Sequence, residues 1–334
     1  HRKYYQIIMK KILVIGGAGY VGCELIPKLL NKSYIVTVYD LMIYGNNLPV
    51  DNKNLHIEKG DVRDLVKLKQ ILKNHDAIIH LACISNDPSF ELNPKLGREI
   101  NFDCFEPLVL AAKQAGIKHF VYASSSSVYG VKDTPNVTEK ASLEPLTDYS
   151  KFKAQCEEVL LSNTDNNFLG SIIRPATVCG YSSRQRLDLV VNILTNLAYH
   201  KKIIKIFGGK QLRPNIHISD MADSYLCLLE ASKEKVANQI FNVGFENYSV
   251  ETLALMVKKN MREKIELEYS ESNDNRSYHI NSDKISKTLG FVPKKNINEA
   301  IKDLIKVFEK KVFSNTLVNE EYFNIKKMQK VKLV

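Results

Sequence analysis

The sequence predicts an α/β fold, a doubly wound parallel sheet followed by a smaller C-terminal α/β cap. Short apolar, β-branched runs alternate with helical stretches from Lys11 to about Arg174. This alternation is typical of a parallel sheet that helices cover on both faces. The chain has 334 residues, of which 44% are hydrophobic, so it can bury a large core. The alternation loosens after Pro175, which indicates a second, smaller unit.

The expected strands of the sheet are nearly continuous apolar runs, at residues 12–15, 35–39, 55–57, 77–82, 120–123 and 171–173. The helices expected between them span residues 21–30, 65–73, 101–114 and 150–161. After Pro175 the pattern predicts a helix over 187–200, a strand over 203–207, a loop over 208–214 and a helix over 220–230. A helix over 250–259, a strand over 265–269 and a final helix over 298–310 complete the cap.

Composition and charge exclude several classes of protein. The formal net charge is +10, but the lysines are spread along the chain and form no aromatic-basic or helix-turn-helix motif, so we expect no nucleic-acid partner. No apolar run approaches the roughly 20 residues of a membrane helix, and no secretory signal is expected. The six cysteines have no metal-ligand spacing, which predicts a reduced cytoplasmic protein and no metal site.

A glycine turn connects the first expected strand to the first expected helix. Its sequence is Gly16-Gly17-Ala18-Gly19-Tyr20-Val21-Gly22. Glycines allow the tight turn and let the backbone approach a pyrophosphate, which then lies at the positive end of the helix. This context predicts a dinucleotide site of the Rossmann type, with the spacing G-x-x-G-x-x-G.

Asp40 ends the second expected strand, about 20 residues after the glycine turn. A carboxylate at this offset would accept hydrogen bonds from the adenosine ribose and repel a 2′-phosphate, so the sequence favours NAD over NADP. The alternative is an acidic cap or turn residue. Asp61 and Val62 follow the third strand as plausible adenine contacts, although an aspartate there is also a common turn former.

Tyr149 and Lys153 are four residues apart at the start of an expected helix, so they share one face. A nearby cation favours the phenolate, which general-base catalysis at neutral pH requires. The spacing alone is weak, because tyrosine and lysine are common in helices. Its position after a dinucleotide turn makes it a predicted proton-transfer pair.

The serine run Ser124-Ser125-Ser126-Ser127 lies at the carboxyl end of the fifth expected strand, where such sheets place their chemistry. One of its hydroxyls is predicted to hydrogen-bond a reacting sugar oxygen and orient it toward Tyr149. The alternative is a serine-rich loop with no role.

With these motifs the chain resembles an extended short-chain dehydrogenase/reductase of the NAD-dependent epimerase/dehydratase family. The resemblance covers roughly Lys10 to Val312. It implies that Ser125, Tyr149 and Lys153 are catalytic. The cofactor contacts that it implies are Gly16, Gly19, Tyr20, Val21, Gly22, Asp40, Asp61, Val62, Leu81, Ala82, Asn101, Tyr149, Lys153 and Val178. The substrate contacts that it implies are Ser125, Ser126, Thr177, Arg186, Arg213 and Arg276.

The resemblance also implies a nucleotide-diphosphate sugar as substrate, because arginines such as Arg213 and Arg276 suit a diphosphate clamp. Oxidation, most often at C4, then leads to an epimerase, a 4,6-dehydratase or a dehydrogenase. Ser126 and Ser127 stand where dehydratases of the family carry an acidic pair, which disfavours dehydration. Thr177 departs from the asparagine of UDP-galactose 4-epimerases. Residues 174–180 together with 183–188 are more similar to a branch that includes GDP-heptose 4-dehydrogenases of bacterial capsule synthesis.

We therefore rank a nucleotide-sugar epimerase first and a C4 dehydrogenase second. A third class, NAD-sensing regulators on the same fold, typically lacks the tyrosine-lysine pair. Relatives pair the helices over 101–114 and 150–161 into a four-helix bundle, so we expect a homodimer. Residues 9–180, with a return segment at about 214–243, are expected to bind NAD. Residues 181–213 and 244–312 are expected to bind the nucleotide sugar, and 313–334 to form a basic tail. His80, His119 and His217 are interpreted as structural.

Overall fold

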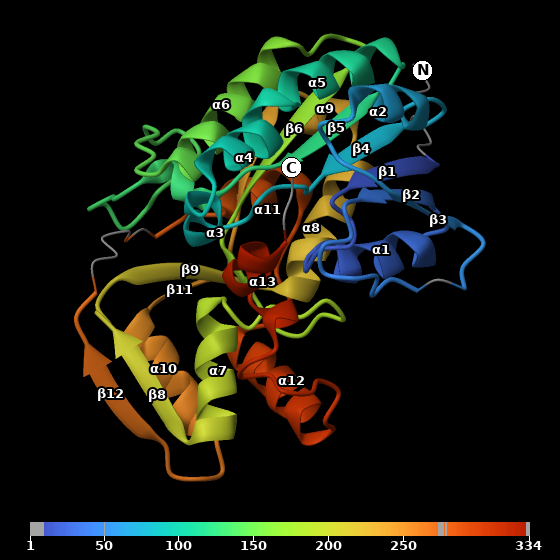
Figure 1. Cartoon of the computed structure of the whole chain (residues 1–334). Coiled ribbons are helices and arrows are strands. Elements are labelled where there is room, and N and C mark those ends of the chain that lie inside the picture. The colour runs from blue at the N-terminus through green and yellow to red at the C-terminus, as the bar shows by residue number, and fades with distance from the viewer. Residues whose placement is uncertain (1–9, 50, 273–276, 278, 332–334) are drawn as a thin grey trace.

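The computed structural model describes residues 10–49, 51–272, 277 and 279–331. A seven-stranded sheet in the order β10-β6-β5-β4-β1-β2-β3 forms its larger part, and all of its pairings are parallel. The strands are β1 Lys11–Ile15, β2 Ile35–Asp40, β3 Leu55–Lys59, β4 Ala77–His80, β5 His119–Ala123, β6 Leu169–Pro175 and β10 Gln239–Val243. The predicted doubly wound sheet is confirmed (Figure 1).

Helices cover both faces of this sheet (Figure 1). Helices α1 (Gly22–Asn31) and α8 (Ile218–Glu230) pack together on one face. Helices α2 (Leu65–Ile71), α5 (Phe105–Gln114) and α6 (Asp148–Ser162) share the apolar core of the other face. Alternate residues of β1 enter the two cores, Ile12 and Val14 on one side and Leu13 and Ile15 on the other. Burial on both faces explains why the strands read as continuous apolar runs.

The strand order reverses between β1 and β4, and this point positions the functional site. From β1 the chain adds β2 and β3 on one side and then returns to add β4, β5 and β6 on the other. Ile15 pairs with Tyr39 of β2 and with His80 of β4, so three strands end at the same level. In an open parallel sheet, the crevice at such a reversal is where ligands bind.

Strand β4 is shorter than the predicted strand over 77–82. The backbone amides of Leu81 and Ala82 both donate to the carbonyl of Ile15, at 2.8 and 3.0 Å. Two donors on one carbonyl end the regular ladder and turn the chain out of the sheet. Both residues consequently reach the crevice.

Three short helical segments follow β4, where the sequence pattern gave no element before residue 101. They are α3 (Asp87–Glu91), α4 (Pro94–Arg98) and a π-helical turn over Glu99–Asp103 that leads into α5. Asn86 and Asn93 cap the two α-helices by accepting hydrogen bonds from Ser89 and Leu96, and a proline occupies the first turn of each. Asparagine caps followed by proline are helix-start signals, but segments of one turn carry too little apolar periodicity to be predicted.

The cap contains two small sheets and three longer helices. Strands β7 (Thr177–Cys179), β9 (Leu212–His217) and β11 (Glu246–Ser249) form one sheet, and β8 (Ile203–Phe207) and β12 (Glu266–Ser270) the other. Helices α7 (Val190–Lys201), α10 (Val250–Asn260) and α12 (Ile297–Glu309) pack on a common apolar core. The other helical segments are α9 Lys233–Val236, α11 Asp283–Leu289, α13 Asn324–Lys330 and the 3-10 turns Ser126–Tyr129 and Glu320–Tyr322.

One expectation for this region is corrected, and one strand was not located. Residues 212–214 were expected in a loop, but they begin β9, because that strand pairs antiparallel with the sequence-distant β11. No strand of the main sheet was located after residue 173, although residues 214–243 were expected to return to the NAD-binding unit, and β10 at the end of that segment joins the sheet beside β6. Both pairings are long-range, so local composition does not report them.

The described residues carry two further general features. No helix among them is both long and apolar enough to cross a membrane. All six cysteine thiols are free.

Candidate active site

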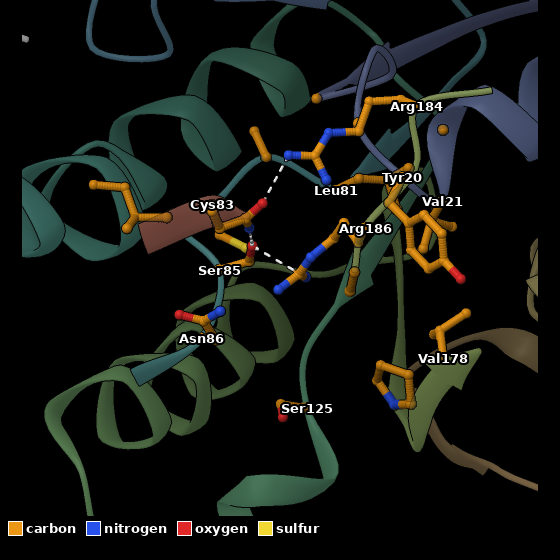
Figure 2. Close-up of a pocket in the computed structure, with 18 of the residues that line it drawn as sticks. Tyr20, Val21, Leu81, Cys83, Ser85, Asn86, Ser125, Val178, Arg184 and Arg186 are labelled. Carbon is orange, nitrogen blue, oxygen red and sulfur yellow. Dashed lines mark hydrogen bonds between the residues drawn. The ribbon is translucent and has the colours of Figure 1, made fainter. Parts of the chain in front are cut away.

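A cavity opens at the carboxyl ends of β1, β2 and β4 and extends toward β5, α6 and β7 (Figure 2). Most of the predicted site residues line it. They are Gly16, Gly19, Tyr20, Val21, Gly22, Asp40, Val62, Leu81, Ala82, Ser125, Ser126, Tyr149, Lys153, Thr177, Val178 and Arg186. The fold thus brings the glycine turn, the proton-transfer pair and the serine run to one place.

Packing requires glycine at two positions of the glycine turn. Gly16 has a φ of +82°, and a Cβ there would lie 2.4 Å from the backbone nitrogen of Ala82. A Cβ on Gly22 would lie 2.1 Å from the carbonyl oxygen of Gly17. A side chain at either position would separate the turn from β4 or from the start of α1.

Asp40 closes the turn from the end of β2. Its carboxylate accepts hydrogen bonds from the backbone amides of Ala18, at 3.0 Å, and Met42, at 2.8 Å. Burial raises the pKa of this carboxyl group, and this effect outweighs the opposing effects of the two amides and of the Arg184 charge. The carboxylate therefore lies beside the glycine turn with lone pairs left for a ribose hydroxyl.

Tyr149 and Lys153 occupy the first turns of α6. Thr147 caps this helix by accepting a hydrogen bond from the amide of Ser150 at 3.2 Å. The ammonium of Lys153 is buried, donates to the carbonyl of Ala123 at 2.7 Å, and lies 5.9 Å from the centre of the Tyr149 ring. A cation is thus fixed between the end of β5 and the phenol, an arrangement that would suit general-base catalysis by Tyr149.

Ser125 lies at the end of β5 in extended backbone. Its Oγ accepts a hydrogen bond from the amide of Ser127 at 3.1 Å and shares another with the Ser127 hydroxyl at 2.8 Å. Ser126 and Ser127 are both buried. The residues that directly follow Ser125 therefore offer hydroxyl groups and no titratable acid.

A buried ion pair connects α6, the helix that carries Tyr149 and Lys153, to the sheet. Arg174 of β6 donates to the carboxylate of Glu157 of α6 from Nε at 2.9 Å and from Nη2 at 2.5 Å. Both side chains are only 3% exposed. The hydroxyl of Ser124 also donates to Glu157, at 2.5 Å. One carboxylate thus holds together α6, β6 and the residue before Ser125.

Three predicted contacts lie away from the cavity lining. The carboxylate of Asp61 is bound by Arg63, whose Nη2 lies 2.7 Å from Oδ2. The side-chain oxygen of Asn101 accepts a hydrogen bond from the backbone amide of Ile84 at 2.8 Å, and its Nδ2 donates to the carbonyl of Ile84 at 3.0 Å. Asn101 thereby holds the cavity wall in place. Arg213 lies on β9 and donates to the carbonyl of Leu212 at 2.9 Å. Arg276 lies outside the described residues.

The structure adds lining residues that the sequence patterns did not single out, among them Tyr44, Cys83, Ser85, Asp87, Arg184 and Asn324. Arg184 stands in the same short segment as Arg186, so the pair of arginines was an available signal. Asn324 belongs to the segment expected to be a basic tail, and it contacts residues far away in sequence, so no local pattern marked it.

The three histidines interpreted as structural are all buried, and none lines the cavity. Burial lowers the pKa of His80 to about 3 and that of His119 to about 4, so both rings are neutral at pH 7. His119 is hydrogen-bonded to Ser171, and His217 contacts Asp303 at 3.2 Å.

A model of the NAD dependent epimerase/dehydratase family matches residues 12–244, more than half of the chain. The chain belongs to this family. The UDP-glucose 4-epimerase of Rhizobium meliloti is 28% identical over 84% of this chain and 92% of that protein. The UDP-glucose 4-epimerase of Lactobacillus helveticus is 26% identical over 87% and 94%. The structure of MoeE5 in complex with UDP-glucose and NAD superposes with a TM-score of 0.80 at 27% identity, covering 91% of this chain and all of that one.

The cavity fits NAD, the cofactor of the epimerase/dehydratase family. Gly19 lines the cavity, and a Cβ there would meet only the carbonyl oxygen of Gly16, at 3.4 Å. Packing within the protein therefore does not require glycine at this position. Close approach of a pyrophosphate does require it.

Replacing Gly19 with valine is accordingly expected to weaken NADH binding by roughly 100-fold or more, because the side chain occupies the space of the pyrophosphate. The melting temperature without cofactor should stay within about 3 °C of the parent, since a Cβ at this position contacts only the carbonyl oxygen of Gly16. Fluorescence titration and thermal unfolding measure the two quantities. Gly22→Val is the control, because its clash with Gly17 should lower stability as well. Equal NADH affinity in Gly19→Val would contradict this placement of the cofactor.

Proposed function

We propose that this protein is an NAD-dependent nucleotide-sugar 4-epimerase that acts on a UDP-hexose. The observation that carries the proposal is that Tyr149, Lys153 and Ser125 line the same cavity as the glycine turn. Two UDP-glucose 4-epimerases that match most of the chain support the choice of reaction. MoeE5, whose structure holds UDP-glucose and NAD, supports the choice of substrate.

Each catalytic side chain has one role in this proposal. Bound NAD supplies a reversible hydride acceptor. The Tyr149 phenolate removes the proton from the C4 hydroxyl of the sugar. It returns the proton after the 4-keto sugar has rotated in the cavity and presents the opposite face of C4 to the cofactor. Lys153 favours the phenolate through its charge and is fixed by Ala123. The hydroxyl of Ser125 hydrogen-bonds the reacting oxygen and keeps it in line with Tyr149.

Two other outcomes for the oxidised sugar are less well supported. A 4,6-dehydratase needs an acid and a base beside C5 and C6, and Ser126 and Ser127 provide neither. A dehydrogenase would release the 4-keto sugar, which fits the resemblance of residues 183–188 to GDP-heptose 4-dehydrogenases. A non-catalytic NAD sensor would not need Tyr149 and Lys153 in the cavity.

We propose the following contacts with the substrate and the cofactor. Thr177 and Ser126 line the cavity near the catalytic group and are assigned to the sugar. Arg213 and Arg276 are assigned to the substrate diphosphate, and Asp61 and Asn101 to the cofactor. We assign NAD to residues 9–180 with the return segment 214–243, and the nucleotide sugar to residues 181–213 and 244–312.

A panel of UDP-, GDP-, CDP- and dTDP-sugars tests the proposed function. The purified protein with NAD is expected to convert a UDP-hexose into its C4 epimer, detected by NMR, with no net rise in absorbance near 340 nm. Stoichiometric NADH together with a 4-keto product would instead indicate a dehydrogenase. No product from any sugar, with Tyr149 intact, would contradict catalysis.

Two properties of the protein in the cell follow as proposals. Helix α5 exposes Leu110, which is 41% exposed and lies on the helix pair that would form a four-helix bundle, so we propose a homodimer. Light scattering during size-exclusion chromatography at micromolar concentration checks this, and a monomer would contradict it.

Six free cysteines suit a reducing compartment, so we propose a cytoplasmic role in supplying sugars for polysaccharide synthesis.

A further inference from the structure

Two arginines that follow β7 lie almost completely buried in the cavity. Arg184 is 3% exposed and Arg186 is 9% exposed. Arg186 is neutralised by Asp188, with Nε 2.9 Å from Oδ1 and Nη2 3.2 Å from Oδ2. Arg184 has a different environment, because its guanidinium stacks on the Tyr44 ring at 3.7 Å from the ring centre.

The charge of Arg184 is opposed only at longer range, by the carboxylates of Asp40 and Asp188. Among the described residues, no carboxylate lies within ion-pair distance of it, and its Nε has no hydrogen-bond partner. Burial, and then the neighbouring Arg186, lower the pKa of Arg184 to about 10, which still leaves it charged at pH 7. A buried cation with no carboxylate in contact is costly, and a bound anion would reduce that cost.

The position of these arginines indicates which anion they meet. The segment that carries them is attached to the glycine turn, because Ser182 Oγ donates to the carbonyl of Tyr20 at 2.8 Å and the Tyr20 hydroxyl donates to the carbonyl of Gly180 at 2.7 Å. Figure 2 shows both guanidinium groups directed toward Cys83 and Ser85. The glycine turn is where a dinucleotide places its pyrophosphate.

The C-terminal segment connects the two arginines. Arg184 Nη2 donates to Asn324 Oδ1 at 2.7 Å, and Asn324 Nδ2 donates to Ser85 Oγ at 2.7 Å. Arg186 Nη1 donates to the same Ser85 oxygen at 3.4 Å, and the backbone amide of Asn324 donates to Asp188 at 2.9 Å. Asn324 is 3% exposed. The neighbouring Phe323 packs with Leu187, Leu304 and Phe308, which holds the segment in place.

We propose that Arg184 and Arg186 bind the diphosphate of NAD together with the glycine turn, and that Asn324 is a positioning residue that directs Arg184 toward it. This gives the C-terminal segment a role in cofactor binding and reassigns Arg186 from the nucleotide sugar to the cofactor. The inference rests on the NAD dependence of the proposed function but not on epimerisation. Its test therefore measures binding without turnover. The proposed diphosphate site can then fail while the epimerase proposal stands, and the reverse.

The first test replaces Arg184 with glutamine and titrates NADH, ADP-ribose, adenosine and UDP against the purified protein. NADH and ADP-ribose, which carry the diphosphate, should bind about 10- to 100-fold more weakly, as expected for one lost charge-assisted contact. Adenosine and UDP should change less than about threefold. The salt dependence of NADH affinity should become shallower, because one cation no longer contributes.

The second test separates binding from folding. Removing a buried cation that has no carboxylate in contact should leave the melting temperature of the cofactor-free Arg184→Gln protein equal to the parent's or higher, while the increase produced by added NAD becomes smaller. A lower melting temperature without cofactor, together with unchanged NADH affinity, would make Arg184 structural and overturn the proposal.

The third test examines Asn324 with a matched asparagine in the same segment. Asn324→Ala should weaken NADH binding by about 3- to 10-fold and speed NADH release from the loaded enzyme, as chased with excess NAD. Asn319→Ala is the control, because Asn319 caps the neighbouring turn by binding the amide of Glu321 and does not line the cavity. The proposal is overturned if NADH affinity in both Arg184→Gln and Asn324→Ala stays within threefold of the parent. It is also overturned if UDP binding is lost instead, or if adenosine binding falls as much as that of ADP-ribose.

Discussion

Replacing Tyr149 with phenylalanine is expected to lower kcat by about 10³-fold or more. The change removes only the phenolic oxygen, and general acid-base catalysis by a positioned group contributes roughly 10²- to 10⁴-fold. Lys153 stays anchored on Ala123, so the cavity should keep its shape and its cofactor. Steady-state kinetics with a UDP-hexose measures the loss, and NADH titration checks that binding is within about threefold of the parent.

A second tyrosine near the same lysine provides the control. Tyr122 is buried on β5, and Lys153 Nζ lies 5.0 Å from its ring centre, but it does not line the cavity. Tyr122→Phe should therefore keep kcat within about tenfold of the parent. Retained turnover in Tyr149→Phe, or an equal loss in both variants, would contradict the assignment of Tyr149 as the base.

Replacing Glu157 with alanine is expected to lower the free energy of unfolding by about 3–5 kcal/mol. The change leaves Arg174 buried at 3% exposure with its Nε and Nη2 deprived of their carboxylate. It also removes the acceptor of the Ser124 hydroxyl, next to Ser125, which we propose to be catalytic. Urea unfolding measures the loss, and activity should fall as well, since α6 carries Tyr149 and Lys153.

The adjacent Glu158 is exposed on the same helix, and Glu158→Ala should change stability by less than about 0.5 kcal/mol. The double variant Glu157→Leu with Arg174→Met should recover most of the stability, because replacing a buried ion pair by apolar groups is often neutral. A loss in Glu157→Ala no larger than in Glu158→Ala would show that the buried pair does not hold α6 to the sheet.

The parts of this molecule that local pattern controls could be predicted from the sequence. Burial on both faces made the strands continuous apolar runs, so six of the seven main-sheet strands were located. The glycine turn and the Tyr149–Lys153 pair each depend on spacing within a few residues. Because parallel strands share a carboxyl edge, their convergence on one cavity followed from the fold class.

The parts that depend on long-range contact could not be predicted. Strand β9 exists because β11 pairs with it. Strand β10 completes the main sheet although it begins at Gln239, 64 residues after β6 ends at Pro175. Asn324 reaches Ser85 from the far end of the chain, and only the folded structure shows this contact.

The most direct test of the central claim uses UDP-glucose that carries deuterium at C4 of the sugar. If the chain is a 4-epimerase, the product should be UDP-galactose with the deuterium still at C4, because the same hydride is removed and returned. NMR and mass spectrometry of the isolated product measure this. A 4-keto sugar accompanied by deuterated NADH, or an epimer that has exchanged the label for solvent hydrogen, would contradict the account.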